Sequence, residues 1–444
     1  MTRPLIGSLT VVLLCLMLSL SAAAQASDET VLVATPTVDG IDIYSADSSG
    51  EVTLVHSLNG FRVGDPIDQD SWFMSRYTDL TVSLDGSQIA FTAQRDGAWA
   101  LFVYTRATDA LLEIALPEEL SIPIWSPDGT SMLLTAGASA PPLSDYVYDL
   151  QTQELNQITS VPQFRENSFH WMPDSTGLFY VGYCETCLPV SQALYQVSRD
   201  GSETTRLAVA SVLAPSDSVA SICHPTWSEP NHRIYFVIGC VGGGGQSNEY
   251  LYSVDLAGNV RAELSGGFNS LYSDEYNVRT INIHPSPFSD QIYITLASQG
   301  GDSTGLSNRR ILHFQAPDIV NIVYEQTQQD EAITSSSMSP NGAAIALVTY
   351  GRGTSNGYLE VIDVTTEERI VGQGTTPSDV CDVFWSDEDT LFYTVDPTGA
   401  CDVARAPQSV WVLDITSGAT QEVTSELGAN VWMLRRVVVT APLN

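Results

Sequence analysis

One short phrase recurs along this chain and constrains its fold more than any other feature. In its clearest copies the phrase begins with Trp and continues through a turn-forming Pro-Asp-Gly or related group into an apolar run. The copies are WSPDGTSMLLT at 125–135, WMPDSTGLFYV at 171–181, WSEPNHRIYFV at 227–237, WSDEDTLFYTV at 385–395, VSLDGSQIAFT at 82–92 and MSPNGAAIALV at 338–348. A period of roughly 40–60 residues with several short strands per unit is typical of a radial β-architecture, the β-propeller.

The repeat predicts four-stranded antiparallel blades, whose strands we name a, b, c and d from the centre outward. Complete units begin near Thr78, Ser121, Asn167, Ser221, Thr280, Thr334 and Asp379. A further unit is split, because residues 31–34, 41–46 and 52–57 have the pattern of strands b, c and d, whereas 431–439 is a lone strand. We therefore predict an all-β propeller of eight blades, closed by the C-terminal strand, with seven blades as the alternative.

The N-terminal segment has the pattern of a secretory signal peptide. Arg3 precedes an apolar run at 9–20, and small residues at 22–26 offer a cleavage site. No later run approaches the ~18 apolar residues that a membrane-spanning helix requires. We expect a signal peptide at 1–26, a single propeller domain at 27–444, and a secreted or periplasmic protein that is not inserted in a membrane.

The charge balance restricts the partners. The chain contains no lysine, and its 18 arginines face 52 acidic residues, which gives a formal net charge of −34. A surface of this sign repels phosphate backbones and anionic lipid headgroups. Nucleic acid is therefore not expected as a partner.

Six of the seven cysteines follow the predicted signal peptide, and an even number in an exported protein indicates disulfides. The repeat register places two pairs on neighbouring antiparallel strands, and the CETC sequence brings a third pair together. The predicted disulfides are Cys223–Cys240, Cys381–Cys401 and Cys184–Cys187. A CxxC pair is also found at redox sites, but there it stands at a helix N-terminus. Because this pair caps a hairpin, we interpret it as a structural bridge.

The phrase PIWSPDGT at 123–130 resembles the repeat of the TolB-like β-propeller family, and partial copies extend the resemblance over the mature chain. The unit at 280–324 departs most from the pattern. The resemblance implies the propeller fold. We expect neither the N-terminal TolB domain nor the peptidase domain of prolyl-peptidase relatives, because the repeats occupy the mature chain and leave no remainder of roughly 250 residues for a hydrolase domain. It says little about function, since this fold serves many activities.

The lengths of the connections differ between the two ends of the predicted blades. The a–b and c–d connections are short, whereas the b–c and d–a connections, which share the opposite face, include the long ones. The long segments are 59–77, 137–144, 182–192, 239–249, 266–279, 298–308 and 396–408. Elaboration of one face predicts a recognition surface on a rigid scaffold. The alternative is neutral drift of tolerated loops.

Two of these segments mix aromatic and acidic residues. The candidate binding residues are Trp72, Phe73, Tyr77, Phe268, Tyr272 and Tyr276. Aromatic faces beside carboxylates suit sugar rings or a cationic peptide, although the rings could instead pin their own loops to the propeller. The cluster Asp65, Asp68 and Asp70 offers oxygen ligands for calcium, but it lacks the EF-hand pattern, and solvated acids are the favoured interpretation.

Two histidines on innermost strands form the candidate metal site. His170 and His224 have the same parity in the repeat, so both point to the same side of strands that line the central channel. Some pectin-fragment lyases with TolB-like propellers are metal enzymes with histidine ligands, a resemblance in architecture only. Channel-lining or packed structural histidines are the favoured interpretation.

We therefore predict an exported, non-enzymatic binding or scaffold propeller that recognises a protein or glycan through its b–c/d–a face. The alternative is a metal-assisted polysaccharide lyase or hydrolase centred on the channel. A third possibility is a structural role in surface assembly. No catalytic residue and no resident cofactor are assigned. The repeated residues are explained by packing between blades and by turn formation, and the titratable residues are dispersed along the loops.

Overall fold

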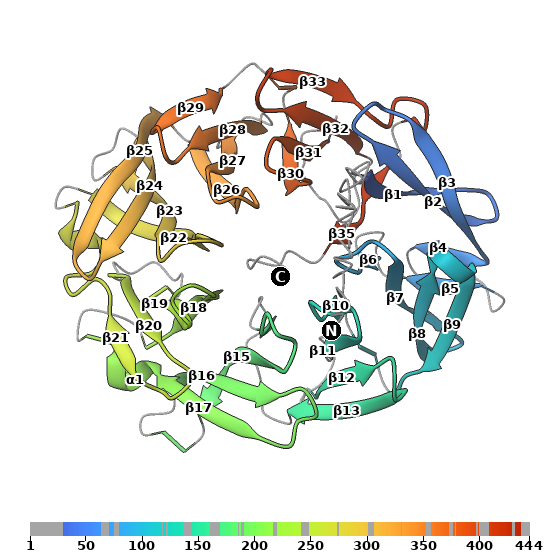
Figure 1. Cartoon of the computed structure of the whole chain (residues 1–444), viewed down its shortest axis with the longest axis horizontal. Helices are drawn as coiled ribbons and strands as arrows, with labels where there is room; N and C mark the ends of the chain where they lie inside the picture. Colours follow the sequence, from blue (N-terminus) through green and yellow to red (C-terminus); the bar gives the residue numbers. More distant parts are fainter. Residues whose placement is uncertain are drawn as a thin grey trace, which may run out of the picture.

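The chain forms a ring of eight blades around a central axis (Figure 1), as the repeat predicts, in a computed structural model. The structure describes residues 30–63, 71–74, 80–117, 119–120, 123–135, 144–159, 169–184, 186–187, 191–215, 220–240, 248–272, 275–300, 306–329, 331–351, 357–372, 376–377, 379–396, 398, 408–428 and 431–436. The predicted signal peptide lies outside these residues. Each blade twists outward from its innermost strand a to its outermost strand d.

The first four blades use the N-terminal half of the chain and one C-terminal strand. Blade 1 contains β34 (Trp432–Met433), β1 (Thr30–Pro36), β2 (Gly40–Asp47) and β3 (Val52–Asn59). Blade 2 contains β6 (Thr81–Val82), β7 (Gln88–Arg95), β8 (Ala98–Thr105) and β9 (Ala110–Ala115), with β4 (Phe61–Val63) and β5 (Trp72–Met74) beside β7. Blade 3 contains β10 (Ile124–Trp125), β11 (Ser131–Thr135), β12 (Asp145–Asp149) and β13 (Glu154–Thr159). Blade 4 contains β14 (Phe169–Trp171), β15 (Gly177–Cys184), β16 (Ser191–Ser198) and β17 (Thr204–Val209).

The other four blades follow in order. Blade 5 contains β18 (Ile222–Ser228), β19 (Arg233–Ile238), β20 (Tyr250–Val254) and β21 (Val260–Ala262). Blade 6 contains β22 (Glu275–Pro285), β23 (Ile292–Gly300), β24 (Leu306–Ala316) and β25 (Ile319–Gln329). Blade 7 contains β26 (Glu331–Met338), β27 (Ala344–Gly351), β28 (Gly357–Asp363) and β29 (Glu368–Val371). Blade 8 contains β30 (Val380–Trp385), β31 (Thr390–Val395), β32 (Ser409–Asp414) and β33 (Ala419–Glu422). The described helices are short, namely η2 (Arg106–Thr108), α1 (Ala210–Leu213) and η3 (Phe268–Ser270).

The C-terminal strand closes the ring, as predicted, and the chain then adds a further short strand to blade 2. Strand β34 pairs antiparallel with β1, with Met433 opposite Val33, and so completes blade 1. Two residues later, β35 (Arg435–Arg436) pairs parallel with β6 of blade 2. Val33 also packs with Phe392 in a shared core between blades 8 and 1. The predicted single closing strand is thus two short strands that join neighbouring blades, and this combination of pairing and burial resists opening of the ring.

The repeated phrase encodes a turn held by side-chain hydrogen bonds. In the turn between β10 and β11, Ser126 Oγ donates to the Asp128 carboxylate at 2.6 Å, and the same carboxylate accepts the Thr130 N–H at 3.0 Å. Gly129 has φ of 67°, a conformation that glycine adopts without a steric penalty. The same hydroxyl–carboxylate pair recurs at Ser83–Asp85 and Ser198–Asp200. Ser-x-Asp in the phrase is therefore a turn device rather than a reactive group.

The tryptophans of the phrase join neighbouring blades. Trp125 is fully buried between blades 2 and 3. Trp171 donates its indole N–H to the Ile124 carbonyl of the preceding blade at 3.0 Å, and Trp385 donates to the Ser337 carbonyl at 3.1 Å. Trp171 and Trp385 each supply apolar area and a hydrogen-bonded N–H, whereas Trp125 supplies apolar area and its indole N–H has no partner among the described residues. These contacts explain the tryptophans by packing.

Two of the predicted disulfides, Cys184–Cys187 and Cys223–Cys240, are present. Cys381 is also disulfide-bonded, and its predicted partner Cys401 lies outside the described residues. Disulfides fit an extracytoplasmic setting, where they form and persist. Among the residues that the structure describes, none of the helices has the length and apolarity needed to cross a bilayer.

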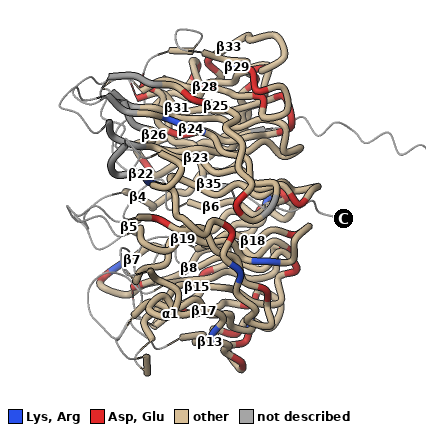
Figure 2. Tube along the Cα trace, turned by 90° about the vertical axis from the view of Figure 1, so that its left-hand side faces the viewer, with Lys and Arg blue, Asp and Glu red and all other residues tan. Residues whose placement is uncertain are grey.

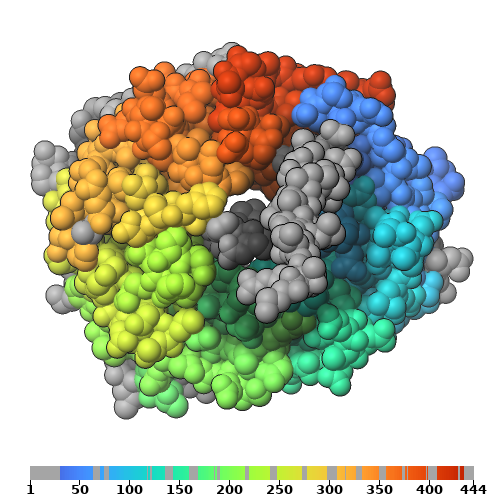
Figure 3. Space-filling model, viewed as in Figure 1, coloured from blue at the N-terminus to red at the C-terminus, as the bar shows by residue number. Residues whose placement is uncertain are grey.

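The two faces of the disc carry different connections. We call the end with the a–b and c–d connections the turn face and the end with the b–c and d–a connections the loop face. The turn face includes the short Asp-centred turns, and many Asp and Glu positions lie along the right-hand edge of the side view (Figure 2). The long connections at 239–249 and 396–408 belong to the loop face. In the space-filling view the ring is hollowed at its centre (Figure 3).

Candidate functional site

The aromatic residues predicted from the first long loop are held by blade 2. Trp72 lies in β5, with its ring edge against Phe102 at a centroid distance of 4.9 Å and the Arg95 guanidinium over its face at 4.4 Å. Phe73, the next residue of the same strand, is 2% exposed. Tyr77 lies outside the described residues. Of the two described residues of this group, Trp72 is the one with an exposed part that can reach a ligand, and the Arg95 guanidinium already lies over one face of its ring.

The second aromatic group shows the same arrangement on blade 6. Phe268 is fully buried and packs edge-on against Phe314 at 6.3 Å. Tyr272 is partly exposed, and the Arg310 guanidinium covers its ring at 3.9 Å. The side chain of Tyr276 lies outside the described residues. The candidate rings Trp72 and Tyr272 are thus each paired with an arginine of the chain itself, an arrangement that stabilises the local structure.

The structure gives each predicted metal-site histidine a packing partner. The His170 ring stacks on Phe179 at 5.1 Å. His224 has a positive φ of 51° at an irregular point of β18 and hydrogen-bonds the backbone of Thr280. Burial lowers the pKa of His224, and the hydrogen bond to Thr280 opposes this shift only in part. These contacts favour structural roles for both rings, and the lowered pKa of His224 favours its neutral form.

A third histidine on an innermost strand is also accounted for by packing. His284 is buried, and its Nε2 lies 3.0 Å from Ser336 Oγ of the next blade. Burial lowers the pKa of His284 to about 3, so the ring is neutral at any physiological pH. Within the described ranges, no three His, Cys, Asp or Glu side chains gather closely enough to hold a metal ion. The predicted calcium ligands Asp65, Asp68 and Asp70 lie outside these ranges.

Glu249, a buried carboxyl group on the loop face, was not identified from the sequence. Its side-chain oxygen accepts the backbone N–H of Thr280 in blade 6 at 2.7 Å, and the residue is 3% exposed. Burial raises the pKa of Glu249 to about 7, although the bonds to Thr280 and the charge of Arg279 act in the opposite direction. Such groups mark functional sites often enough that the structural alternative has to be tested.

Blade 4 provides that test, because it places a glutamine at the same point of its own strand c. The Gln192 side-chain oxygen accepts the backbone N–H of Ile222, in the first strand of blade 5. We call this contact the amide latch and the Glu249–Thr280 contact the carboxyl latch. Both latches connect the beginning of strand c to strand a of the following blade. A neutral amide performs this task in blade 4, so Glu249 is explained as a fastening between blades rather than as a catalytic acid.

A buried ion pair connects blade 6 to blade 7. Arg309 in β24 lies 3.2 Å from Glu360 in β28, and both side chains are fully buried. Arg369 contacts the other oxygen of Glu360 at 3.0 Å, and Arg309 donates to Gln326 at 2.7 Å. Removing one member of such a pair leaves a buried charge uncompensated. The network joins blades 6 and 7 and lies away from the loops.

Comparisons with known proteins support the fold and extend no further. No known protein family matches the sequence, and no curated protein is similar to it. A prolyl endopeptidase structure is 12% identical, with a TM-score of 0.52 over 81% of this chain and 49% of that one, so this chain spans about half its length. A eukaryotic initiation factor structure is 12% identical, with a TM-score of 0.51 over 94% of this chain and 100% of that one.

The structural neighbours also include TolB from Acinetobacter baumannii. It is 17% identical over 77% of this chain and 62% of that one, with a TM-score of 0.36. A TM-score this low carries no argument about this chain. At identities of this order, the comparisons show that the chain is a β-propeller and leave its activity open.

Proposed function

We propose that this protein is an exported binding or scaffold propeller that recognises a neutral or cationic glycan or protein segment through its loop face. The observation that carries the proposal is the difference between the faces. Short turns fixed by Asp–Ser and Asp–Thr hydrogen bonds close one face, and the long connections belong to the other. A rigid scaffold with variable loops at one end is a common way to build a recognition surface.

The charge of the chain narrows the class of partner. With 52 acidic residues, 18 arginines and no lysine, the protein repels polyanions over the range of the Debye length. The partly exposed rings of Trp72 and Tyr272 add apolar faces suited to sugars or cations. These properties together favour uncharged or basic ligands over pectin-like or nucleic-acid polyanions.

Exposed apolar side chains provide variants for the two faces. Val212 in helix α1 is 78% exposed on the loop face, whereas Phe288, in the turn between β22 and β23, is 63% exposed on the turn face. Replacing either by Glu changes the surface without opening the core. The pair is therefore a matched test of which face binds.

The test is the thermal unfolding of the mature protein with neutral, cationic and anionic hexasaccharides and with an arginine-rich peptide. A ligand at a hundred times its Kd stabilises the protein by about 2.7 kcal/mol. We expect stabilisation by the neutral or cationic probes, weakened by Val212→Glu or Tyr272→Ala and retained in Phe288→Glu. A response to none of the four probes would leave a structural assembly role. A response to the anionic sugar that requires Mn²⁺ and is lost in His170→Ala and His224→Ala would instead support the lyase or hydrolase.

A further inference from the structure

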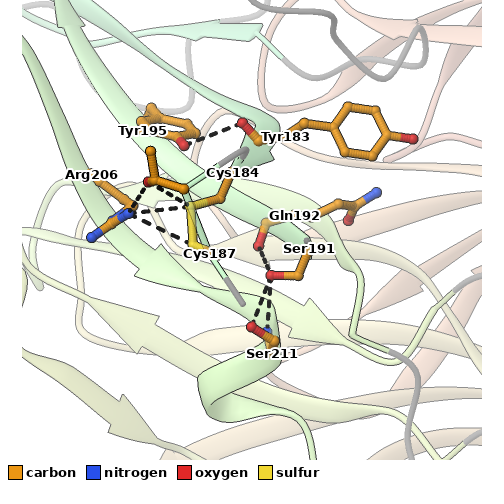
Figure 4. Close-up of a disulfide and its surroundings, with 9 residues drawn as sticks. Tyr183, Cys184, Cys187, Ser191, Gln192, Tyr195, Arg206 and Ser211 are labelled. Atoms are coloured by element: carbon orange, nitrogen blue, oxygen red, sulfur yellow. Dashed lines mark hydrogen bonds between the residues drawn. A yellow bond between two sulfur atoms is a disulfide. The ribbon is translucent and has the colours of Figure 1, made fainter. Parts of the chain in front are cut away.

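The disulfide of the CETC sequence differs from an ordinary structural bridge in its surroundings (Figure 4). It links Cys184, the last residue of β15, to Cys187 in the connection to β16 on the loop face, across three sequence positions. Cys184 is 1% exposed, whereas Cys187 is partly exposed. One sulfur is therefore shielded by the blade, and the other is open to an attacking group.

A guanidinium group is directed at both sulfurs. Arg206 lies in β17, the outermost strand of the same blade. Its Nη1 is 3.2 Å from Cys184 Sγ and 3.7 Å from Cys187 Sγ (Figure 4). The same nitrogen donates to Thr186 Oγ1 at 3.4 Å. A neutral disulfide sulfur is a weak acceptor, whereas a thiolate is a strong one. The arginine is thus better matched to the reduced state of this pair than to the oxidised state.

Arg206 differs from another arginine of its blade in the partners of its guanidinium group. Arg199, on the same blade, forms ion pairs with Asp128 at 3.2 Å and Asp149 at 2.6 Å. Within the described part of the chain, Arg206 has no carboxylate within ion-pair distance. With no carboxylate of the described residues at ion-pair distance, the exposed Arg206 guanidinium has its charge directed at the sulfur atoms, where it would stabilise a thiolate.

The second disulfide provides an internal comparison. Cys223–Cys240 spans 17 sequence positions and links β18 to the end of β19, two strands that are already paired. Its described polar neighbours are Ser221 Oγ at 3.8 Å and the Val237 carbonyl at 4.0 Å from Cys240 Sγ. Neither neighbour is a cation. The two disulfides therefore lie in the same propeller but differ in their described contacts: a guanidinium lies beside Cys184–Cys187, and no cation is among the described polar neighbours of Cys240.

We propose that Cys184–Cys187 is a redox-active disulfide, reversibly reduced by a protein dithiol, with Arg206 as the group that stabilises the Cys184 thiolate. A thiolate of the reductant attacks Cys187 Sγ, the S–S bond breaks, and its electron pair passes to Cys184 Sγ beside Arg206. The second thiol of the reductant then attacks the mixed disulfide and releases Cys187. In total, two electrons and two protons pass from the dithiol to the two cysteines, and the reductant becomes a disulfide.

The inference is independent of what the loop face binds. Reduction removes a covalent link on that face while leaving the antiparallel pairing of β15 and β16 in place, from Gly177 opposite Ser198 to Cys184 opposite Ser191. The blade thus retains its hydrogen bonds, and the change is confined to the connection. This separation of a local covalent change from the fold is what a reversible redox site requires.

The test is a redox titration of the folded mature protein in buffers of reduced and oxidised dithiothreitol. Freed thiols are alkylated, and mass spectrometry quantifies each disulfide separately. We expect Cys184–Cys187 to open at a reduced-to-oxidised ratio at least tenfold lower than Cys223–Cys240, a difference of about 30 mV for this two-electron couple. Simultaneous opening of both disulfides, or opening of Cys184–Cys187 only after unfolding in urea, would overturn the proposal.

Variants of the arginine separate its charge from its packing. Arg206→Gln is expected to raise the ratio needed to open Cys184–Cys187 about tenfold and to leave Cys223–Cys240 unchanged, while Arg206→Lys retains most of the wild-type response. Arg199→Gln, on the same blade, is the control and is expected to change neither disulfide. An unchanged Cys184–Cys187 titration in a folded Arg206→Gln protein would show that the guanidinium has no redox role.

Discussion

Carboxyl groups at the two faces of the disc respond to their surroundings in opposite ways. On the turn face, the Ser198 hydroxyl and the Ser202 N–H and hydroxyl lower the pKa of Asp200 to about 2. On the loop face, burial raises the pKa of Glu249 to about 7. Hydrogen bonds outweigh desolvation at an exposed turn, whereas desolvation outweighs them inside a blade junction. The turn face is thus built for ionised acids, and the loop face contains an acid that is more stable protonated.

The largest expected effect is a loss of stability through Glu249 as the pH rises from about 4.5 to about 7. Its folded-state pKa lies above the unfolded value of 4.5, so its contribution is fully present below pH 4.5 and is lost as pH rises through about 7. A shift of this size corresponds to about 3 kcal/mol. Urea unfolding at pH 5, 7 and 9 measures it, and Glu249→Gln should remove most of the decline. The same decline in wild type and variant would show that Glu249 does not titrate in this range.

A somewhat smaller effect is expected on converting the amide latch into a carboxyl latch. Gln192→Glu retains an acceptor for the Ile222 N–H but introduces a charge at a buried position. We expect a loss of roughly 1–3 kcal/mol at pH 8, as for a buried polar group left imperfectly compensated, and little loss at pH 5, where the new carboxyl is neutral. Equal losses at both pH values would mean that the latch depends on shape rather than charge.

The smallest effect is expected on the turn face. Asp200→Asn retains the size of the side chain but weakens the contacts that lower the pKa of the wild-type carboxyl. Since the folded-state pKa is depressed, the contribution of the ionised group is present above pH 3.8 and is lost as pH falls toward 2. Thermal unfolding at pH 7 and pH 3 should show a small deficit that shrinks in acid. A deficit that grows in acid would contradict this direction.

The sequence was sufficient for the fold because the repeat records local chemistry. The turn between β10 and β11 is formed by residues that are close in sequence, Ser126, Asp128 and Gly129, so a short sequence motif suffices to recognise it. The split first blade was also predictable, because an unpaired edge strand and a lone C-terminal strand have one economical solution. The addition of β35 to blade 2 was not predictable, since two residues carry no periodic signal.

The candidate site was less accessible to sequence reasoning because its contacts cross between distant segments. Arg95 covers Trp72, and Arg310 covers Tyr272, yet neither arginine belongs to the loop whose ring it covers. Glu249 depends on Thr280 of another blade. Its position in the repeat did hold a signal, because Gln192 stands at the same point of strand c, and comparing the repeats at that point would have indicated a polar fastening.

The central claim, that the loop face is the recognition surface, is tested most directly by hydrogen exchange of the mature protein with and without the cationic hexasaccharide. The account predicts slower exchange at residues 210–213 and 264–272 on the loop face, with unchanged exchange in the turns at 126–131 and 198–204. Protection centred on those turns, or spread equally over both faces, would contradict it.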